Sequence, residues 1–333
     1  MKSRMITAAL GVVIGMTAMT AGFADAKTLK ASHQWPGGKG DVRDEMVQII
    51  AREVGKANVD LKIKVYPGKS LFKPKEQWGA MVKGQLDISA FPLAYAAGRH
   101  PEFDATLMPG LVKNHDHAMR LNSSPFMDDI KKIINDAGVV VLADAWLAGG
   151  FASKNHCILG PDTMKGQVTR AAGKAFEQML VGAEASIASM PSSEIYSALQ
   201  TGVLDAANTS SGSFVSYRIY EQVKCLTAPG ANALWFMYEP LLMSKKSFDK
   251  LTKDQQAALM KAGEVAEEFF FSAAKNLDAK LVKAYKDAGV KVVEMSSEQA
   301  KAWRDIANET SYKTFAAKVE GGDVLIQKAL SVK

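Results

Sequence analysis

Arg170 is the residue of this sequence whose surroundings best suit the binding of an anion. It ends the stretch 168–170, which looks like the end of a strand, and Ala-Ala-Gly at 171–173 then leads into a helix predicted over 174–181. A guanidinium beside the free N–H groups of a helix N-terminus can bind a carboxylate through charge-assisted hydrogen bonds. An ordinary surface salt bridge is the alternative interpretation of an arginine at this position.

A second polar feature lies at residues 208–213, which read Asn-Thr-Ser-Ser-Gly-Ser. This stretch follows a strand predicted to begin at 203–206. Ligand clefts of α/β proteins form at the carboxyl ends of strands. Asn208 and Thr209 are therefore candidate ligand residues, and a plain hydroxyl-rich loop is the alternative.

Aromatic side chains recur near predicted strand ends and turns. Any one of them is as readily explained as a core residue, but several together would suit the apolar walls of a ligand cleft. The candidates are Trp35, Trp78, Phe91, Tyr95, Trp146, Trp235 and Phe236.

Motifs for catalysis or metal binding are sparse. The sequence has no phosphate-binding glycine loop, no Gly-x-Ser-x-Gly elbow and no His-Glu-x-x-His. His115, Asp116 and His117 form the one close histidine group, but two histidines on a loop need further ligands to hold a metal. The alternative is a loop in which Asp116 caps a helix at 117–121. We therefore predict no catalytic residue, no metal and no cofactor.

Charge and cysteine content narrow the class of protein. The formal net charge is +6, the two signs are interspersed, and no basic run exceeds two residues, so nucleic-acid binding is not expected. Cys157 and Cys225 are the only cysteines. In an oxidising compartment such a pair favours one disulfide. Two buried free thiols are the alternative.

The N-terminus has the pattern of a secretory signal. Lys2 and Arg4 precede an uncharged stretch at 5–23, and Ala-Asp-Ala at 24–26 provides small residues for a signal peptidase. We predict cleavage after Ala26 and export to the periplasm. A transmembrane anchor is the alternative. No later stretch approaches 18 uncharged apolar residues, so the mature chain is not expected to insert into a membrane.

Alternating strand and helix patterns position these residues. Strands are expected at 29–32, 61–66, 86–91 and 139–143, the last as a parallel strand, with helices at 41–56 and 74–83. The middle of the chain repeats the pattern, with strands at 168–170, 186–190 and 203–206 and helices at 174–181 and 194–200. This alternation predicts an α/β fold. A chain of about 300 residues usually divides into two lobes.

A long helix is predicted near the C-terminus. Thr252 and Gln255 form a capping box, and no proline interrupts the sequence before Gly289, although Gly263 is a candidate bend. Some 35 residues at 1.5 Å each give about 50 Å of helix, more than the roughly 40 Å width of one lobe. The helix should therefore lie across both lobes. A second capping box, at Ser296 and Gln299, predicts a further helix.

Several segments resemble the solute-binding proteins of TRAP (tripartite ATP-independent periplasmic) transporters. KGQVTR at 165–170 is similar to a Lys-Gly-x-x-x-Arg strand of that family, and MPSSEIYSALQTGVLD at 190–205 to its helix-and-strand signature. YPGKSL at 66–71 and GQLD at 84–87 also fit. The resemblance covers essentially all of residues 27–333.

The resemblance implies a two-lobed periplasmic binding protein fold of the type II-like class, in which ligand closes the lobes. We place lobe I at 27–148 plus 235–270 and lobe II at 149–234 plus 271–333. It also implies that the closed form docks on small and large TRAP membrane subunits. The arginine matching Arg170 pairs with the substrate carboxylate in the family, a polar residue falls near Asn208 or Thr209, and Ser192 of the signature joins the predicted ligand residues.

One departure from the family concerns residues 146–153. Many members have a second arginine soon after the strand that crosses between lobes, whereas this stretch reads WLAGGFAS. The hypothesis that follows is a monocarboxylate ligand with an apolar or aromatic portion. The rival interpretations are a receptor for an ABC transporter, a periplasmic enzyme acting on a carboxylate, and an extracellular sensor.

Overall fold

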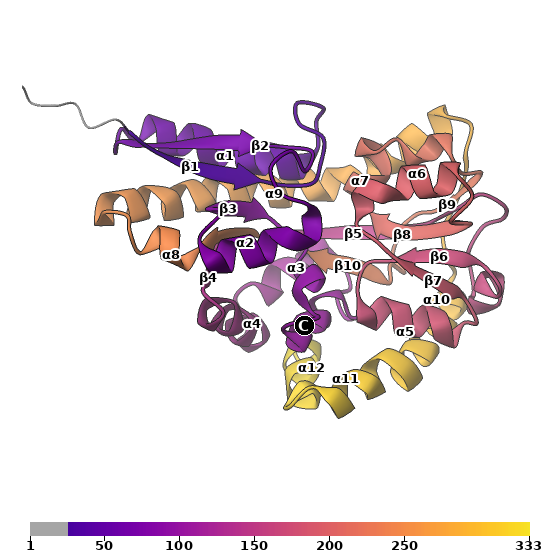
Figure 1. The fold of residues 1–333 in the computed structure, drawn as a ribbon. Helices are drawn as coiled ribbons and strands as arrows, with labels where there is room; N and C mark the ends of the chain where they lie inside the picture. The colour runs from indigo at the N-terminus through magenta and orange to yellow at the C-terminus, as the bar shows by residue number, and fades with distance from the viewer. Residues whose placement is uncertain (1–25) are drawn as a thin grey trace, which may run out of the picture.

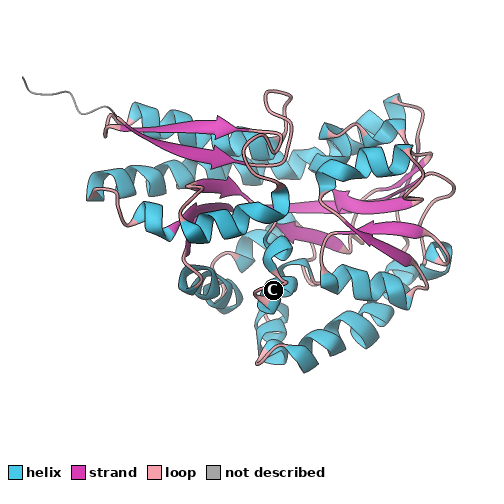
Figure 2. Ribbon diagram, viewed as in Figure 1, coloured by secondary structure: helices cyan, strands magenta, loops and turns pink. Residues whose placement is uncertain are grey.

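Two β-sheets, each covered by helices, organise the computed structural model, which describes residues 26–333 (Figures 1 and 2). The predicted signal peptide lies outside the described residues apart from Ala26, so its cleavage stays a prediction. The predicted two-lobed α/β fold is confirmed.

Lobe I is built on a five-stranded sheet with the order β2-β1-β3-β11-β4. Its strands are β1 (Lys27–Ser32), β2 (Leu61–Tyr66), β3 (Ile88–Ala90), β4 (Val139–Ala143) and β11 (Leu241–Ser244). Its helices are α1 (Val42–Lys56), α2 (Gln77–Lys83), α3 (His115–Leu121), α4 (Pro125–Asp136) and α8 (Lys245–Phe248). A parallel strand is expected at 139–143, but β4 is an edge strand antiparallel to β11. Helices cover β4 on both faces, as its apolar run indicates, but its direction relative to its neighbour is not parallel.

Lobe II is built on a seven-stranded sheet with the order β12-β9-β5-β8-β6-β7, in which β10 also pairs with β5. Its strands are β5 (Trp146–Ser153), β6 (Val168–Ala171), β7 (Ser186–Ser189), β8 (Ala206–Ser210), β9 (Cys225–Thr227), β10 (Trp235–Tyr238) and β12 (Lys291–Val293). Its helices are α5 (Lys174–Gly182), α6 (Ile195–Gln200), α7 (Ser211–Ser216) and α10 (Ser297–Ala307). β5, β8 and β6 bring the two predicted ligand segments, at 170 and 208–209, side by side.

The long helix is α9 (Lys253–Asp287), 35 residues without a break, and it passes behind both lobes (Figure 1). The predicted capping box of Thr252 and Gln255 is present. Leu259 packs in the core of lobe I, and Leu281 packs in the core of lobe II. Gly263 does not interrupt the helix. A Cβ there would lie 2.0 Å from the carbonyl oxygen of Leu142, so glycine lets α9 approach β4 closely.

The chain passes between the sheets at residues 144–145 and 239–240. The expected lobe boundaries, at 148/149 and 234/235, differ because β5 and β10 pair with each other as strands of lobe II along their whole common length. The C-terminal segment is likewise shared between the lobes. α10 packs on α5, whereas α11 (Lys313–Lys318) leads to α12 (Gly322–Leu330), which packs on α4 of lobe I.

Cys157 and Cys225 form a disulfide, with their Cα atoms 5.1 Å apart. The bond ties the segment after β5 to β9, and so joins two regions of lobe II that are 68 residues apart in sequence. The favoured interpretation of the two cysteines is therefore confirmed. In the described part of the chain, no helix combines the length and apolar character needed to cross a membrane.

Candidate functional site

Arg170 lies at the end of β6 with 1% of its surface exposed. Its Nε donates to the carbonyl of Met190 (2.9 Å), Nη1 to the carbonyl of Asn208 (2.8 Å) and Nη2 to the hydroxyl of Tyr95 (3.0 Å). These acceptors are all neutral, and none of the salt bridges within residues 26–333 includes Arg170. A guanidinium carries five N–H donors. One donor on each terminal nitrogen therefore remains available for a bidentate partner.

Tyr95 joins the two lobes beside Arg170. It belongs to a 3-10 helix of lobe I (Leu93–Ala96), and its hydroxyl oxygen also accepts from the backbone N–H of Ser192 in lobe II at 3.0 Å. Because both acceptor positions of this oxygen are used, its own O–H is left to donate. Phe91 supports the ring edge-to-face at 6.1 Å and is fully buried.

Asn208 supplies a second polar group to this cluster. Its side chain is completely buried, and neither amide atom has a hydrogen-bond partner among residues 26–333. Buried side-chain amides are usually hydrogen-bonded, so this one marks a position for a polar ligand group. Thr209 follows it on β8 and is also buried. Its carbonyl oxygen lies only 2.0 Å from where a Cβ at Gly149 would be, so β5 needs glycine at this point.

Arg43, at the start of α1, forms a second buried cluster. Its Nε and Nη2 pair with the two oxygens of Asp41, at 2.9 and 2.7 Å. Its Nη1 contacts Glu239 Oε2 (3.0 Å) and the hydroxyls of Ser210 (2.9 Å) and Ser213 (3.1 Å). The residues come from both lobes and from a crossing segment, so this cluster lies where the lobes meet.

The electrostatics of the two clusters are linked. Burial lowers the pKa of Arg43, but Asp41 and Glu239 raise it by more, and the guanidinium stays charged. Burial raises the pKa of Glu239 above its ordinary value, while the positive charges of Arg43 and, more weakly, Arg170 oppose that rise. The charge of Arg43 is thus matched by carboxylates of the protein, whereas that of Arg170 is not.

The loop after β1 forms the lobe I wall. Tyr217 donates from its hydroxyl to the carbonyl of Gln34 at 2.8 Å, and burial raises the pKa of this tyrosine well above its ordinary value. Both side-chain amide atoms of Gln34 are buried and have no partner within the described chain. The predicted residue Trp35 is fully buried, with the Arg43 guanidinium 4.2 Å above its ring.

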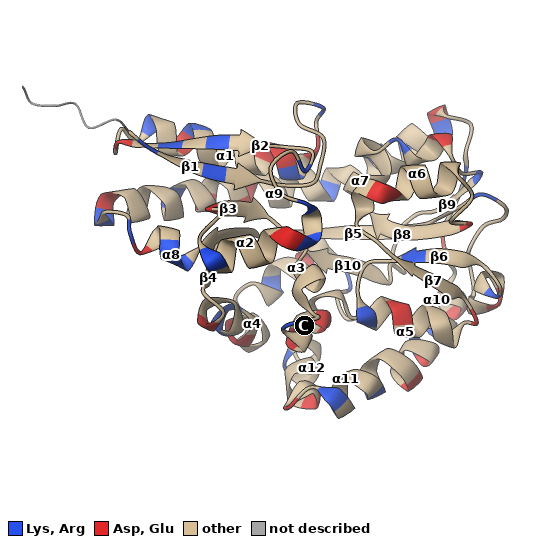
Figure 3. Cartoon of the chain, viewed as in Figure 1, with Lys and Arg blue, Asp and Glu red and all other residues tan. Residues whose placement is uncertain are grey.

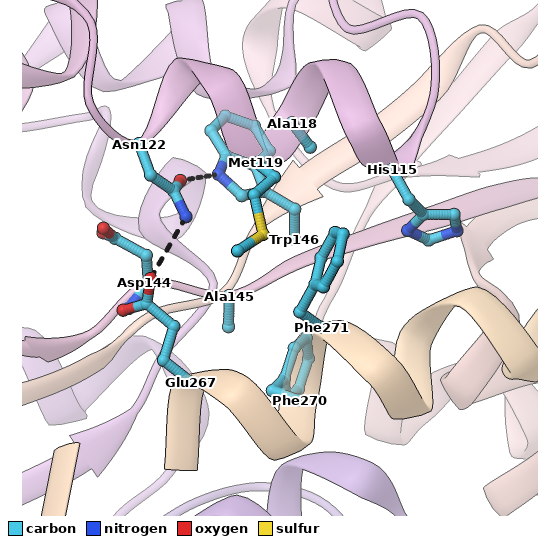
Figure 4. A pocket seen from close by; sticks show the side chains of 10 residues that line it. All are labelled: His115, Ala118, Met119, Asn122, Asp144, Ala145, Trp146, Glu267, Phe270 and Phe271. Atoms are coloured by element: carbon cyan, nitrogen blue, oxygen red, sulfur yellow. Dashed lines mark hydrogen bonds between the residues drawn. The ribbon is translucent and has the colours of Figure 1, made fainter. Parts of the chain in front are cut away.

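The remaining predicted aromatic residues lie elsewhere. Trp146 packs against Tyr238, donates to Asn122 Oδ1 at 2.9 Å and lines a small separate cavity between α3 and α9 (Figure 4). No contact joins it to Arg170 in the described residues. Trp235 is buried in the core of lobe II, and its indole N–H has no partner within residues 26–333.

The helix after Arg170 is not a free anion site. α5 begins at Lys174, and the carboxylate of Asp104 from lobe I lies beside its N-cap residue Gly173, with Oδ1 3.2 Å from where a Cβ at that glycine would be. Burial raises the pKa of Asp104 to about 6, against the lowering effect of the backbone N–H groups of Ala175 and Lys174. A carboxylate of the chain itself, rather than a ligand, occupies this helix end.

The histidine group has structural partners. α3 begins at His115 and is capped by Asn114, whose side chain accepts from the N–H of His117, so the expected cap at Asp116 is wrong. His115 contacts Asp278 at 3.0 Å, and His117 contacts the carbonyl of Val332 at 3.1 Å. No group of three or more His, Cys, Asp or Glu residues in the described chain is arranged to hold a metal.

Sequence reasoning predicted the aromatic residues of lobe I at this site but missed its polar and charged residues, Gln34, Asp41 and Arg43, and Glu239 of the crossing segment. Gln34 follows a predicted strand, and because ligand residues of α/β proteins gather at strand ends, it could have been named as a candidate. Arg43 and Asp41 look like ordinary charged residues at a helix start, and nothing local indicates that they are buried. Glu239 lies between two apolar strands, where a buried carboxylate needs a cation that only the fold supplies. Elsewhere, acidic and basic residues are interspersed over both lobes (Figure 3).

Known proteins share this architecture and sequence. Residues 44–318 match the model of the bacterial extracellular solute-binding proteins, family 7. A solute-binding protein of Albidiferax ferrireducens is 43% identical over 303 residues, covering 90% of each chain. A C4-dicarboxylate-binding periplasmic protein of Rhodobacter capsulatus is 26% identical, covering 89% of this chain and 90% of the relative.

Among solved structures, a TRAP periplasmic solute-binding protein from Rhodoferax ferrireducens with bound malonate is 42% identical. It superimposes with a TM-score of 0.88 over 91% of this chain and 98% of its own. A succinate-bound TRAP protein from Sulfurospirillum deleyianum shares the fold, with a TM-score of 0.82 at 24% identity over 92% and 99% of the two chains. The chain therefore belongs to family 7 of the bacterial extracellular solute-binding proteins, and it is a solute-binding protein of the TRAP type.

Proposed function

We propose that this protein captures a small organic carboxylate between its two lobes in the periplasm and delivers it to the membrane subunits of a TRAP transporter, without transforming it. The observation that carries the ligand class is the state of Arg170. This cation is almost fully buried, is held by three neutral acceptors and is matched by no carboxylate of the described chain. A buried charge is stable only when it is paired.

The first carboxylate of the ligand is proposed to bind between Arg170, Tyr95 and Asn208. The two free guanidinium N–H donors and the Tyr95 O–H all lie in this cluster, and the Asn208 amide can donate as well. The rest of the ligand would meet Gln34 and Trp35 on the lobe I wall. Both residues are buried and carry polar atoms that have no partner in residues 26–333.

The finer proposal is a monocarboxylate with an apolar portion. Arg43, the second buried arginine, forms salt bridges with Asp41 and Glu239, so it offers no unmatched charge to a second carboxylate. The sequence-based hypothesis of a monocarboxylate rested on the stretch that begins at Trp146. Because Trp146 does not contact the Arg170 cluster, the proposal now rests on the paired charge of Arg43. A short dicarboxylate is the second candidate, because malonate is bound in the relative from Rhodoferax ferrireducens.

Calorimetric titration of a matched panel tests both candidates. The panel pairs malonate and succinate with monocarboxylates of the same length, at constant ionic strength. Tighter binding of the monocarboxylates supports the finer proposal, and tighter binding of malonate replaces it with the second candidate. If no carboxylate binds, the ligand class itself is wrong.

Two further measurements test the remaining parts of the proposal. Mass spectrometry of the bound ligand after long incubation should recover it unchanged, and a product would indicate an enzyme. N-terminal sequencing of the exported protein should begin at Lys27.

A further inference from the structure

We infer that Arg43 is a latch between the lobes, which favours the closed form even before ligand is bound. The latch consists of Arg43 in lobe I and the hydroxyls of Ser210 and Ser213 in lobe II. The inference rests on the proposed function in one respect, namely that the lobes open and close.

The contacts of Arg43 divide into those that opening would break and those that it would leave. Asp41 is the N-cap residue of the same helix, so its two-oxygen pairing with Arg43 moves with lobe I. Ser210 and Ser213 lie on β8 and α7 and move with lobe II. In the proposed opening, the bonds from Arg43 Nη1 to these hydroxyls, at 2.9 and 3.1 Å, break. Glu239 Oε2, 3.0 Å from the same nitrogen, lies on the crossing segment and belongs to neither group.

The groups of the latch are oriented by contacts within their own lobes. Asp41 fixes Nε and Nη2 of Arg43, and the ring of Trp35 lies 4.2 Å from the guanidinium carbon. On the other side, Ser210 caps α7 by accepting from the backbone N–H of Ser213. Because both partners are already oriented, little side-chain entropy is lost when they meet.

The latch is coupled to the ligand cluster through β8. Ser210 is two residues from Asn208, whose carbonyl accepts from Arg170. Closure by Arg43 therefore brings Gln34 and Trp35 of lobe I toward a lobe II surface that already carries Arg170. A ligand then binds to a site that is partly assembled, and the apparent affinity rises with the fraction of closed protein.

Gly212 gives a way to disturb the latch without changing any group of the ligand cluster. A Cβ at this position would lie 2.9 Å from Nη2 and 3.2 Å from the central carbon of the Arg43 guanidinium. The position is helical and its φ is not positive, so alanine suits the backbone. Gly212→Ala should thus push the guanidinium away from α7. Gly55→Ala is the matched control, because a Cβ there meets nothing within 4 Å.

The experiment measures the distance between spin labels at Lys62→Cys, on β2, and Gln200→Cys, on α6, both exposed positions. In the ligand-free protein we expect a closed fraction that falls in Gly212→Ala and remains in Gly55→Ala. Ser213→Ala is a second test variant, since it removes one latch acceptor and keeps the cap of α7. Thermal melting identifies any variant that fails to fold.

Malonate titration adds an independent readout. We expect Gly212→Ala to bind malonate about tenfold more weakly, through faster dissociation. Identical ligand-free distance distributions in the parent, Gly212→Ala and Ser213→Ala proteins would overturn the latch. Failure of malonate to bind the parent protein would count against malonate as the ligand and not against the latch, because the ligand-free distances still decide the latch.

Discussion

Arg170→Ala is the sharpest test of the ligand site. The substitution removes the one buried guanidinium that no carboxylate within residues 26–333 matches. Truncating one partner of a buried, hydrogen-bonded charge pair costs about 2–5 kcal/mol of binding free energy. Since 1.4 kcal/mol is tenfold in affinity, Kd should rise by about 30- to 4,000-fold.

The same change also affects the free protein. The carbonyls of Met190 and Asn208 lose the hydrogen bonds that they accept from Arg170, so the melting temperature should fall as well. Arg170→Lys separates the two effects. It keeps the positive charge, but a single ammonium cannot reproduce three bonds in a planar fork together with a bidentate ligand contact. We expect Arg170→Lys to remain folded and still to bind at least tenfold more weakly, by about 1.4 kcal/mol.

Isothermal titration calorimetry with the best ligand of the carboxylate panel gives the affinities. Lys165→Ala is the control, because it removes an exposed cation that pairs with Glu184 on the surface of the same lobe. That variant should bind as the parent does. If Arg170→Ala remains folded and binds within threefold of the parent, Arg170 is not the carboxylate partner and the reasoning from its unmatched charge is refuted.

The other predictions concern the support around the site. Tyr95→Phe should weaken binding about tenfold, because the hydroxyl that bridges the lobes is lost, and equal calorimetric affinity would contradict this. Replacing Cys157 and Cys225 by serine should lower the free energy of unfolding by about 2–4 kcal/mol, measured by urea denaturation, with ligand affinity unchanged. Gly263→Ala should destabilise the protein by about 1–3 kcal/mol in the same assay, because the new Cβ meets a backbone carbonyl of β4. The pKa of Asp104 is raised to about 6 in the folded protein, so the folded state binds more protons than the unfolded state between about pH 4 and pH 6. Stability should therefore fall as pH rises through this window, by at most about 3 kcal/mol, and the fall should be smaller in Asp104→Asn.

Local sequence signals predicted much of the fold. The capping boxes at Thr252 and Ser296 begin helices in the structure, and the unbroken helix that follows Thr252 crosses both lobes as its length requires. Such signals succeed because a cap is a contact between residues three apart. The apolar run of β4 gave the wrong strand arrangement, because hydrophobicity reports burial and not which strand lies alongside.

The sequence by itself determined that Arg170 lies at the end of a strand, and it predicted Asn208 just after another strand. The structure places Asn208 within β8, the strand that pairs with β6. Only the tertiary structure decided which groups surround them. Arg43 reaches Ser210 across 167 residues of sequence, and Asp104 occupies the helix end that local pattern left open for a ligand. The physical reason is that the free energy that a charged side chain contributes depends on its burial and on its partner. Both are properties of the assembled cleft, and no short stretch of sequence contains them.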